Sequence, residues 1–169
     1  MYILETERLR LRQFEPLDAA FILAILNEPS FIQNIGDRGV RTGDEARAYL
    51  LNGPIASYEK NGFGLYLVEL KATGEAIGMC GLVRREGLED VDIGYALLPQ
   101  FWSRGYAVEA ARAVKEYARD VIGLKRLVAI SDPANENSIR ILEKIGLKFE
   151  KIVRLSADDI ELKLFATDL

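Results

Sequence analysis

The hydrophobic pattern of the first third of the chain predicts one strand and two helices. Apolar and charged residues alternate over 9–14, which is typical of an edge strand with one face in water. From 17 to 26 the apolar residues recur at helical spacing, and Pro29 should end that helix. Thr42 and Glu45 have the spacing of a capping box, so a second helix is expected to begin there.

The rest of the chain is predicted to form strands separated by two further helices. Gly53 and Pro54 should kink or break the second early helix. The strongest amphipathic pattern predicts a helix over 106–121, and another is expected over 137–145, each followed closely by a glycine. Alternating or short apolar runs predict strands at 64–70, 76–83, 91–97, 127–130, 147–155 and 160–165.

This order of elements combines antiparallel hairpins with one strand-helix-strand crossover. It predicts an α+β fold rather than a doubly wound parallel sheet. The chain has 169 residues, the usual length of one domain, and no repeat, low-complexity tract or linker divides it. We therefore expect a single domain over 1–169.

Composition narrows the chemistry that such a domain can perform. With 26 acidic and 22 basic residues the net charge is -4, which disfavours nucleic acid and suits a cationic substrate. No membrane segment or secretion signal is expected, and Cys80 has neither a disulfide partner nor a zinc-ligand cluster around it. These features indicate a cytoplasmic protein without a bound metal. Because the chain has no histidine, proton transfer must come from carboxylates, hydroxyls or water.

A tight turn at 100–107 connects the strand that ends near Leu97 to the strongest helix. Free backbone N–H groups and the positive dipole end of a helix bind pyrophosphate when small residues let it approach. The turn has neither the Walker spacing nor the three glycines of a dinucleotide fingerprint. The alternative is that Gly105 only eases the turn from strand to helix.

The turn resembles the coenzyme A motif of the GNAT acyltransferase superfamily, [QR]-x-x-G-x-[GA]. Gln100, Gly105 and Ala107 lie in that frame, and Ser103 stands where the first glycine is usual. Residues 132–147 resemble the N-x-x-S-x-x-x-x-E-K-x-G-F ending of the branch that acetylates ribosomal-protein N-termini. The opening at 5–12, Glu-Thr-Glu-Arg-Leu-Arg-Leu-Arg, is also typical of that branch.

This resemblance implies a mostly antiparallel sheet of about six to seven strands, with helices on both faces. It also implies that the fourth and fifth family strands, 91–98 and 127–131 here, splay apart around the pantetheine arm of acetyl-coenzyme A. Backbone groups near Leu97 and Leu98 would bind that arm and polarise the thioester carbonyl, and Asn135 would contact it from the other side. The turn would supply the remaining contacts through Gln100, Ser103, Arg104, Gly105, Tyr106 and Ala107.

The resemblance also implies two groups for proton transfer. A carboxylate near the fourth family strand serves as base in this superfamily, and the matching residue is Asp92, with Glu89 in reserve. The alternative for Asp92 is an outward-facing strand residue or an arginine partner. Many members protonate the thiolate with a tyrosine, but Leu142 occupies that position, so Ser138 is the expected replacement. The alternative for Ser138 is a hydroxyl that satisfies a free N–H at the helix start.

The resulting hypothesis is an acetyl-coenzyme A-dependent N-acetyltransferase that modifies a protein or peptide α-amine without a covalent enzyme intermediate. Residues 34–42 and the two early helices would form the wall of the acceptor site. A second hypothesis replaces the acceptor with a polyamine, an amino acid or an aminoglycoside. A third is a non-catalytic coenzyme A sensor. The protein is expected to be a monomer or a homodimer.

Overall fold

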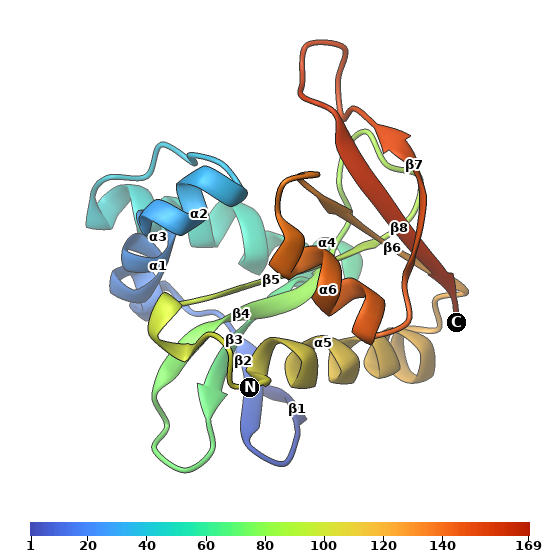
Figure 1. Cartoon of the computed structure of the whole chain (residues 1–169). Helices are drawn as coiled ribbons and strands as arrows, with labels where there is room; N and C mark the ends of the chain where they lie inside the picture. The colour runs from blue at the N-terminus through green and yellow to red at the C-terminus, as the bar shows by residue number, and fades with distance from the viewer.

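An open sheet of eight strands runs through the molecule in the computed structural model, which describes all of residues 1–169 (Figure 1). The strands are β1 (Tyr2–Glu5), β2 (Leu9–Gln13), β3 (Leu65–Leu70), β4 (Ala76–Val83), β5 (Asp92–Leu97), β6 (Arg126–Ser131), β7 (Lys148–Val153) and β8 (Leu162–Asp168). Their order is β1-β2-β3-β4-β5-β6-β8-β7, and all neighbours are antiparallel except β5 and β6. The predicted α+β class with a mostly antiparallel sheet is confirmed.

The sheet has more strands than the six to seven expected, and the strand that was not predicted, β1, lies at its N-terminal edge. β1 pairs with β2, so the segment predicted as an edge strand lies inside the sheet, between β1 and β3. β1 is four residues long with both ends exposed, and its sequence has no alternating pattern. The chain is turned back by Thr6, whose N–H donates to Leu9 O and whose hydroxyl accepts from Leu9 N–H.

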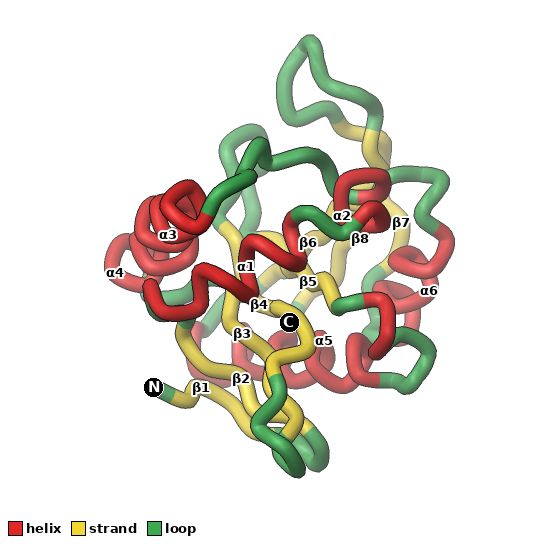
Figure 2. Tube along the Cα trace, turned by 90° about the vertical axis from the view of Figure 1, so that its left-hand side faces the viewer, coloured by secondary structure: helices red, strands yellow, loops and turns green.

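Helices cover both faces of the sheet (Figures 1 and 2). Alternate residues of β3 show the division. Tyr66 and Val68 pack in the core beneath the C-terminal helices, whereas Leu67 packs against the N-terminal ones. The helices are α1 (Ala19–Leu26), α2 (Pro29–Asn34), α3 (Gly43–Leu50) and α4 (Ala56–Asn61), then α5 (Tyr106–Tyr117) and α6 (Glu136–Lys144).

Prolines and π-helical turns set the helix ends that the pattern did not predict. Pro29 was expected to end a helix but begins α2, since the first helical position needs no N–H donor. Pro54 lies in a π-helical turn, Leu51–Ile55, that joins α3 to α4 without ending the helical path. A second such turn, Ala118–Ile122, leaves Val121 65% exposed instead of on the buried face of α5.

The single parallel contact of the sheet, between β5 and β6, is reduced to one residue pair. Asp92 pairs with Val128, and the Val128 N–H donates to Val91 O at 3.1 Å. Beyond that pair β5 and β6 form no further residue pairs, whereas β4 and β5 pair along the whole length of β5. The two central strands therefore separate toward their C-terminal ends, as the family resemblance implied.

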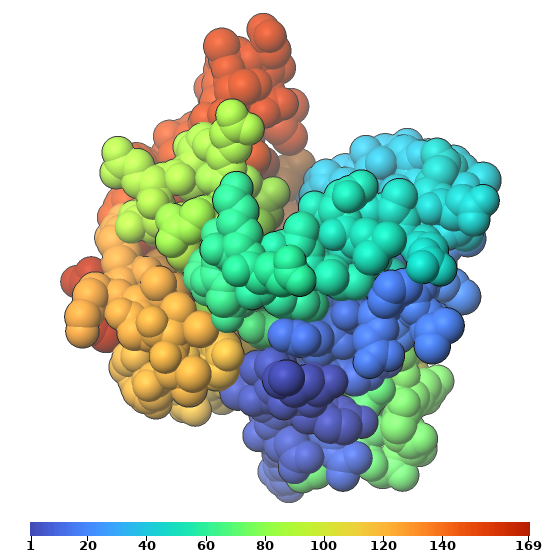
Figure 3. Space-filling view, turned by 180° about the vertical axis from the view of Figure 1, so that it is seen from behind, coloured from blue at the N-terminus to red at the C-terminus, as the bar shows by residue number.

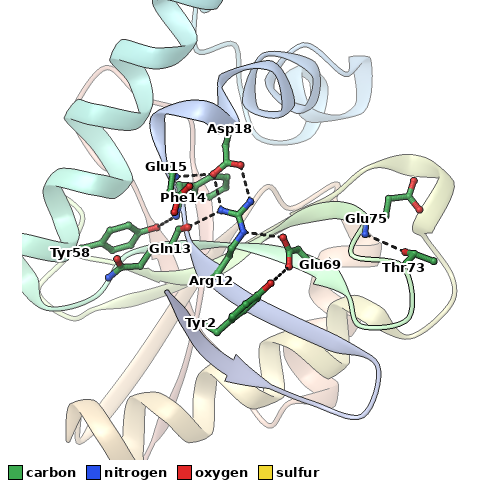
Figure 4. Close-up of polar contacts among 10 residues, drawn as sticks. All are labelled: Tyr2, Arg12, Gln13, Phe14, Glu15, Asp18, Tyr58, Glu69, Thr73 and Glu75. Atoms are coloured by element: carbon green, nitrogen blue, oxygen red, sulfur yellow. Dashed lines mark hydrogen bonds and ion pairs between the residues drawn. The ribbon is translucent and has the colours of Figure 1, made fainter.

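A charged cluster ties the N-terminal strands to the first helix (Figure 4). The guanidinium of Arg12 on β2 donates to both carboxylate oxygens of Asp18 at 2.8 and 2.9 Å. Its Nε donates to Glu69 on β3 at 2.9 Å, and the Tyr2 hydroxyl donates to the same carboxylate at 3.0 Å. Because all three charged side chains are less than one fifth exposed, this cluster is part of the folded core.

The loop of the β7–β8 hairpin projects from the sheet at the end of β8 that lies away from the C-terminus (Figure 1). Seen from behind, the yellow-green connection between β4 and β5 lies against the base of this hairpin (Figure 3). Gly87 in that connection has φ +93°, and an added Cβ would lie 2.5 Å from Leu155 O. The two loops are therefore packed backbone to backbone.

None of the helices combines the length and apolar character that crossing a bilayer requires.

Candidate active site

The separation of β5 from β6 opens a cavity of about 610 Å³. Its lining comes from both faces of the sheet. On one side lie residues of α1, α2 and the following loop, including Asn34 and Arg38. On the other lie the start of α5, the α6 N-cap residue Asn135 and residues of α6, including Ser138. The cavity therefore connects the two faces of the sheet at the place where its strands part.

The turn before α5 presents free backbone donors to this cavity. Gly105 is the N-cap residue with φ +80°, and no side chain caps the helix. The first N–H that bonds within the helix is that of Glu109, to Gly105 O at 3.0 Å. The N–H groups of Tyr106, Ala107 and Val108 have no partner within the helix. Free N–H groups of this kind, together with the helix dipole, favour the binding of an anionic group such as a diphosphate.

Ser103 is the only non-glycine residue of the chain with a positive φ, +60°. This explains why glycine is usual at this position of the motif. A left-handed conformation costs an L-residue about 1 to 2 kcal/mol, and glycine costs about 0.5 to 1 kcal/mol of backbone entropy instead. Ser103→Gly is expected to leave the free energy of unfolding unchanged or to raise it by up to about 1 kcal/mol. Urea unfolding measures this.

The matched variant is Gly105→Ala at the next left-handed position. It should lower the free energy of unfolding, because φ is +80° there and the new Cβ would lie 3.3 Å from Arg8 Nη2. If Ser103→Gly were the more damaging of the two, backbone strain would not describe this turn.

Only one of the two amides expected beside the pantetheine arm faces the gap between β5 and β6. The Leu98 N–H donates to Ile77 O of the β4 side at 2.9 Å. Because antiparallel backbone groups alternate between the two edges of a strand, the amide groups of Tyr95 and Leu97 point toward β6. The Leu97 carbonyl accepts from Trp102 Nε1 at 2.9 Å, and the Leu97 N–H is free to donate at the gap.

Two other residues of the turn lie outside the cavity. Gln100 is exposed and does not contribute to the lining. Arg104 is also exposed, with its guanidinium 5.9 Å from the centre of the Phe101 ring. Ser103, Gly105, Tyr106 and Ala107 do line it.

Asp92 lies at the point where the two parallel strands part. It is 1% exposed, and its Oδ2 is 3.3 Å from Arg85 Nη2, while its Oδ1 has no hydrogen-bond partner. Burial raises the pKa of Asp92 above its ordinary value, and the opposing attraction of Arg85 does not cancel this. It is an arginine partner but not an outward-facing residue. Glu89, its proposed reserve, is exposed and outside the lining.

Ser138 meets a residue that the sequence did not single out, Tyr95. The Tyr95 hydroxyl lies 3.0 Å from both the hydroxyl and the carbonyl oxygen of Ser138. Asn135, not Ser138, caps α6, because its Oδ1 accepts from the Ser138 N–H at 3.2 Å. The Ser138 hydroxyl is therefore not needed at the helix start. Burial raises the pKa of Tyr95, so its hydroxyl stays protonated at neutral pH.

Asp92 and Tyr95 face opposite sides of the sheet. They are three residues apart on one strand, and successive strand side chains alternate between faces. Ala96, which shares the face of Asp92, packs toward the N-terminal helices, and Tyr95 points toward α6. The separation of three residues, an odd number that places Tyr95 on the face opposite Asp92, was the one signal in the sequence that could have indicated Tyr95.

Cys80 is fully buried, and burial raises the pKa of its thiol, so it is no nucleophile.

An anion site, a carboxylate and a hydroxyl pair thus meet at one opening in a mixed sheet. Such an arrangement suits group transfer from a carrier that bears phosphate. The chain belongs to the GNAT acetyltransferase family, since residues 8–148 match the family described as acetyltransferase (GNAT) domain. It is therefore an acyltransferase. Members of this family use acetyl-coenzyme A as donor and amines as acceptors.

Two bacterial proteins are similar to this chain along most of its length. The Bacillus subtilis protein YkkB, uncharacterised, is 34% identical over 154 residues, covering 89% of this chain and 88% of that protein. The uncharacterised N-acetyltransferase YoaA of the same species is 31% identical over 153 residues, covering 90% and 86%.

Solved structures share the fold along nearly the whole chain. An acetyltransferase from Agrobacterium tumefaciens superposes with a TM-score of 0.82 at 26% identity, covering 97% of this chain and 92% of that one. RimL, a ribosomal L7/L12 α-N-protein acetyltransferase solved in complex with coenzyme A, gives a TM-score of 0.84 at 18% identity, covering 100% and 98%. The resemblance to the ribosomal-protein branch is thus confirmed in the fold.

Proposed function

We propose that this protein transfers an acetyl group directly from acetyl-coenzyme A to the α-amine of a protein or peptide N-terminus. The observation that carries the proposal is the placement of Asp92 and of the Tyr95–Ser138 pair on opposite faces of the same opening. A base on the acceptor side and an acid on the cofactor side are what direct transfer to an amine requires. RimL, which shares the fold, acts on a protein α-amine.

The residues at the opening fit the cofactor. The free N–H groups at the start of α5 would hold its diphosphate, and the Leu97 N–H would hold the pantetheine arm. When bound, acetyl-coenzyme A supplies the activated acyl group. Asp92 would take a proton from the attacking amine, and the Tyr95–Ser138 pair would donate one toward the departing sulfur. Asn135 would act through Ser138, whose N–H it holds.

A small-molecule amine is the second candidate acceptor. A cavity of about 610 Å³ lies within the usual range for sites that enclose a small ligand, and Leu155 and Ile160 of the projecting hairpin help to line it. A non-catalytic sensor, the third hypothesis, has no support from the family membership.

Thermal unfolding with and without acetyl-coenzyme A tests the donor. Saturation at about 100 times the dissociation constant adds roughly 2.7 kcal/mol, which should raise Tm by about 5 to 10 °C. Trp102, the single tryptophan, lines the cavity, so its fluorescence gives a second measure of binding. A panel of peptide N-termini, polyamines, amino acids and aminoglycosides, read by mass spectrometry, then identifies the acceptor. Acetylation of small amines alone would contradict the proposed α-amine.

The hydroxyl pair gives a test of proton donation. Tyr95→Phe is expected to lower kcat about 100-fold with little change in the KM for acetyl-coenzyme A, because general acids contribute about 10² to 10⁴. Ser138→Ala should lower kcat less, about tenfold, since the tyrosine hydroxyl remains. Steady-state kinetics measures both. Full turnover by Ser138→Ala with unchanged cofactor affinity would remove Ser138 from the mechanism, and full turnover by Tyr95→Phe would remove Tyr95.

A further inference from the structure

The loop between β1 and β2 lies against the start of α5, about 100 residues away in the sequence. Three side chains make this contact: Thr6 and Arg8 from the loop and Glu109 from the first turn of the helix. We call them the β1–α5 clamp. Neither Arg8 nor Glu109 lines the cavity, so the clamp lies behind the turn and not in the site.

The clamp holds both the helix and the turn that precedes it. Glu109 accepts from the Thr6 hydroxyl, from the Arg8 N–H at 3.0 Å and from Arg8 Nε at 2.7 Å. Arg8 Nη1 donates to the carbonyl of Arg104 at 3.0 Å, and its guanidinium lies 4.4 Å from the centre of the Tyr106 ring. Arg8 therefore contacts the residues on either side of Gly105.

The charges of the clamp also bear on anion binding. Glu109 places a carboxylate in the first turn of α5 beside the free N–H groups, where a negative charge would oppose a bound diphosphate. Its side chain is 19% exposed. Burial acts to raise the pKa of Glu109, but the bonds from Thr6 and Arg8 outweigh it and hold this pKa below its ordinary value. The carboxylate is thus ionised, and Arg8 neutralises it.

We propose that Arg8 and Glu109 are positioning residues that hold the 103–107 turn in its diphosphate-binding conformation, and that Arg8 also neutralises the charge of Glu109, so that the field at the α5 N-terminus stays positive. This inference rests on the proposed function, because the diphosphate is that of acetyl-coenzyme A. It also accounts for the opening motif at 5–12, in which Leu9 and Leu11 supply core contacts and Thr6 and Arg8 supply the clamp.

The experiment compares two donors that differ only beyond the pantetheine arm. S-acetylpantetheine keeps the thioester and the arm but has neither the diphosphate nor the nucleotide. Arg8→Met and Glu109→Gln should each lower kcat/KM for acetyl-coenzyme A about tenfold or more, the loss typical of a charge-assisted hydrogen bond. The same variants should keep the wild-type kcat/KM with S-acetylpantetheine. Arg8→Met should lower kcat/KM for acetyl-coenzyme A more than Glu109→Gln does, since it leaves Glu109 ionised and without a cation beside the anion site.

Matched controls separate this effect from loss of structure. Glu116→Gln changes an exposed carboxylate two turns further along α5 and should behave as wild type with both donors. Equal losses with both donors would overturn the proposal, because they would show a general defect, and unchanged kinetics with acetyl-coenzyme A would overturn it as well.

If the proposed function is wrong, the result is different, because the wild-type protein is then inactive with both donors. In that case the inference is tested by measuring the affinity of each variant for coenzyme A, with Trp102 fluorescence as the readout. An unchanged affinity would overturn it, and an affinity lowered about tenfold would support it.

Discussion

Replacing Asp92 by asparagine is expected to lower kcat/KM for amine acetylation by about 10² to 10⁴-fold, the range for loss of a general base. The same change should leave Tm unchanged or higher. Burial raises the pKa of Asp92, so its ionised form costs stability at every pH above that pKa, and an amide removes the cost. Steady-state kinetics and thermal unfolding of the same preparation measure the two effects.

The matched control for this variant lies two residues earlier in the chain. Asp90 pairs with Arg126 at 3.1 Å on the surface, so Asp90→Asn should keep wild-type activity. Two outcomes would contradict the assignment of Asp92 as base. One is full activity of Asp92→Asn, and the other is a loss of activity that comes with a fall in Tm, which would mark a structural carboxylate.

Replacing Arg12 by leucine is expected to lower the free energy of unfolding by about 3 kcal/mol at neutral pH. The change removes the only cation from between Asp18 and Glu69 and leaves two little-exposed carboxylates facing each other (Figure 4). Arg10→Leu on the same strand is the control. Arg10 pairs with a half-exposed Glu5, and an exposed pair is worth less than about 1 kcal/mol. Urea unfolding of both variants tests this, and equal losses would contradict it.

The pH dependence of the Arg12 effect follows from the direction of the pKa shift. Burial acts to raise the pKa of Asp18, but its bonds with Arg12 and with the Glu15 N–H together outweigh this, and the folded-state pKa lies below the ordinary value. A depressed carboxylate pKa contributes stability that is present above the unfolded pKa of about 4 and is lost as pH falls through the folded value. The gap between wild type and Arg12→Leu should therefore narrow below about pH 4. A constant gap would show that Asp18 does not contribute.

Local chemistry accounts for the elements that were predicted well. The hairpin strand 76–83 and the start of α5 at Tyr106 agree with the structure to the residue, because a glycine turn and a strong helical period mark them within a few positions. The capping signal at Thr42 is also present, since its hydroxyl accepts from the Glu45 N–H at 3.1 Å. The Glu45 carboxylate instead accepts from the Arg41 N–H, so half of the expected box is shifted by one residue.

The candidate site could be predicted only in part. Asp92 and Ser138 came from the motifs in which they stand, and the structure brings both to one cavity. Tyr95 was missed because its role depends on a contact with Ser138, 43 residues away. Arg85 was missed because it meets Asp92 only after the connection between β4 and β5 folds back.

The sequence by itself determined the hydrophobic periodicity that marks each main helix and strand, the turn with its free helix N-terminus, and the family. These depend on neighbours within a few residues, where spacing and backbone freedom are enough. Only the tertiary structure decided that β1 closes the sheet edge, that β5 and β6 part after one residue pair, and that Arg8 meets Glu109. The last two depend on groups far apart in the chain, whose meeting is set by packing of the whole sheet and not by any local pattern. β1 pairs with its neighbour in the chain, but its own four residues have no alternating pattern that would indicate a strand.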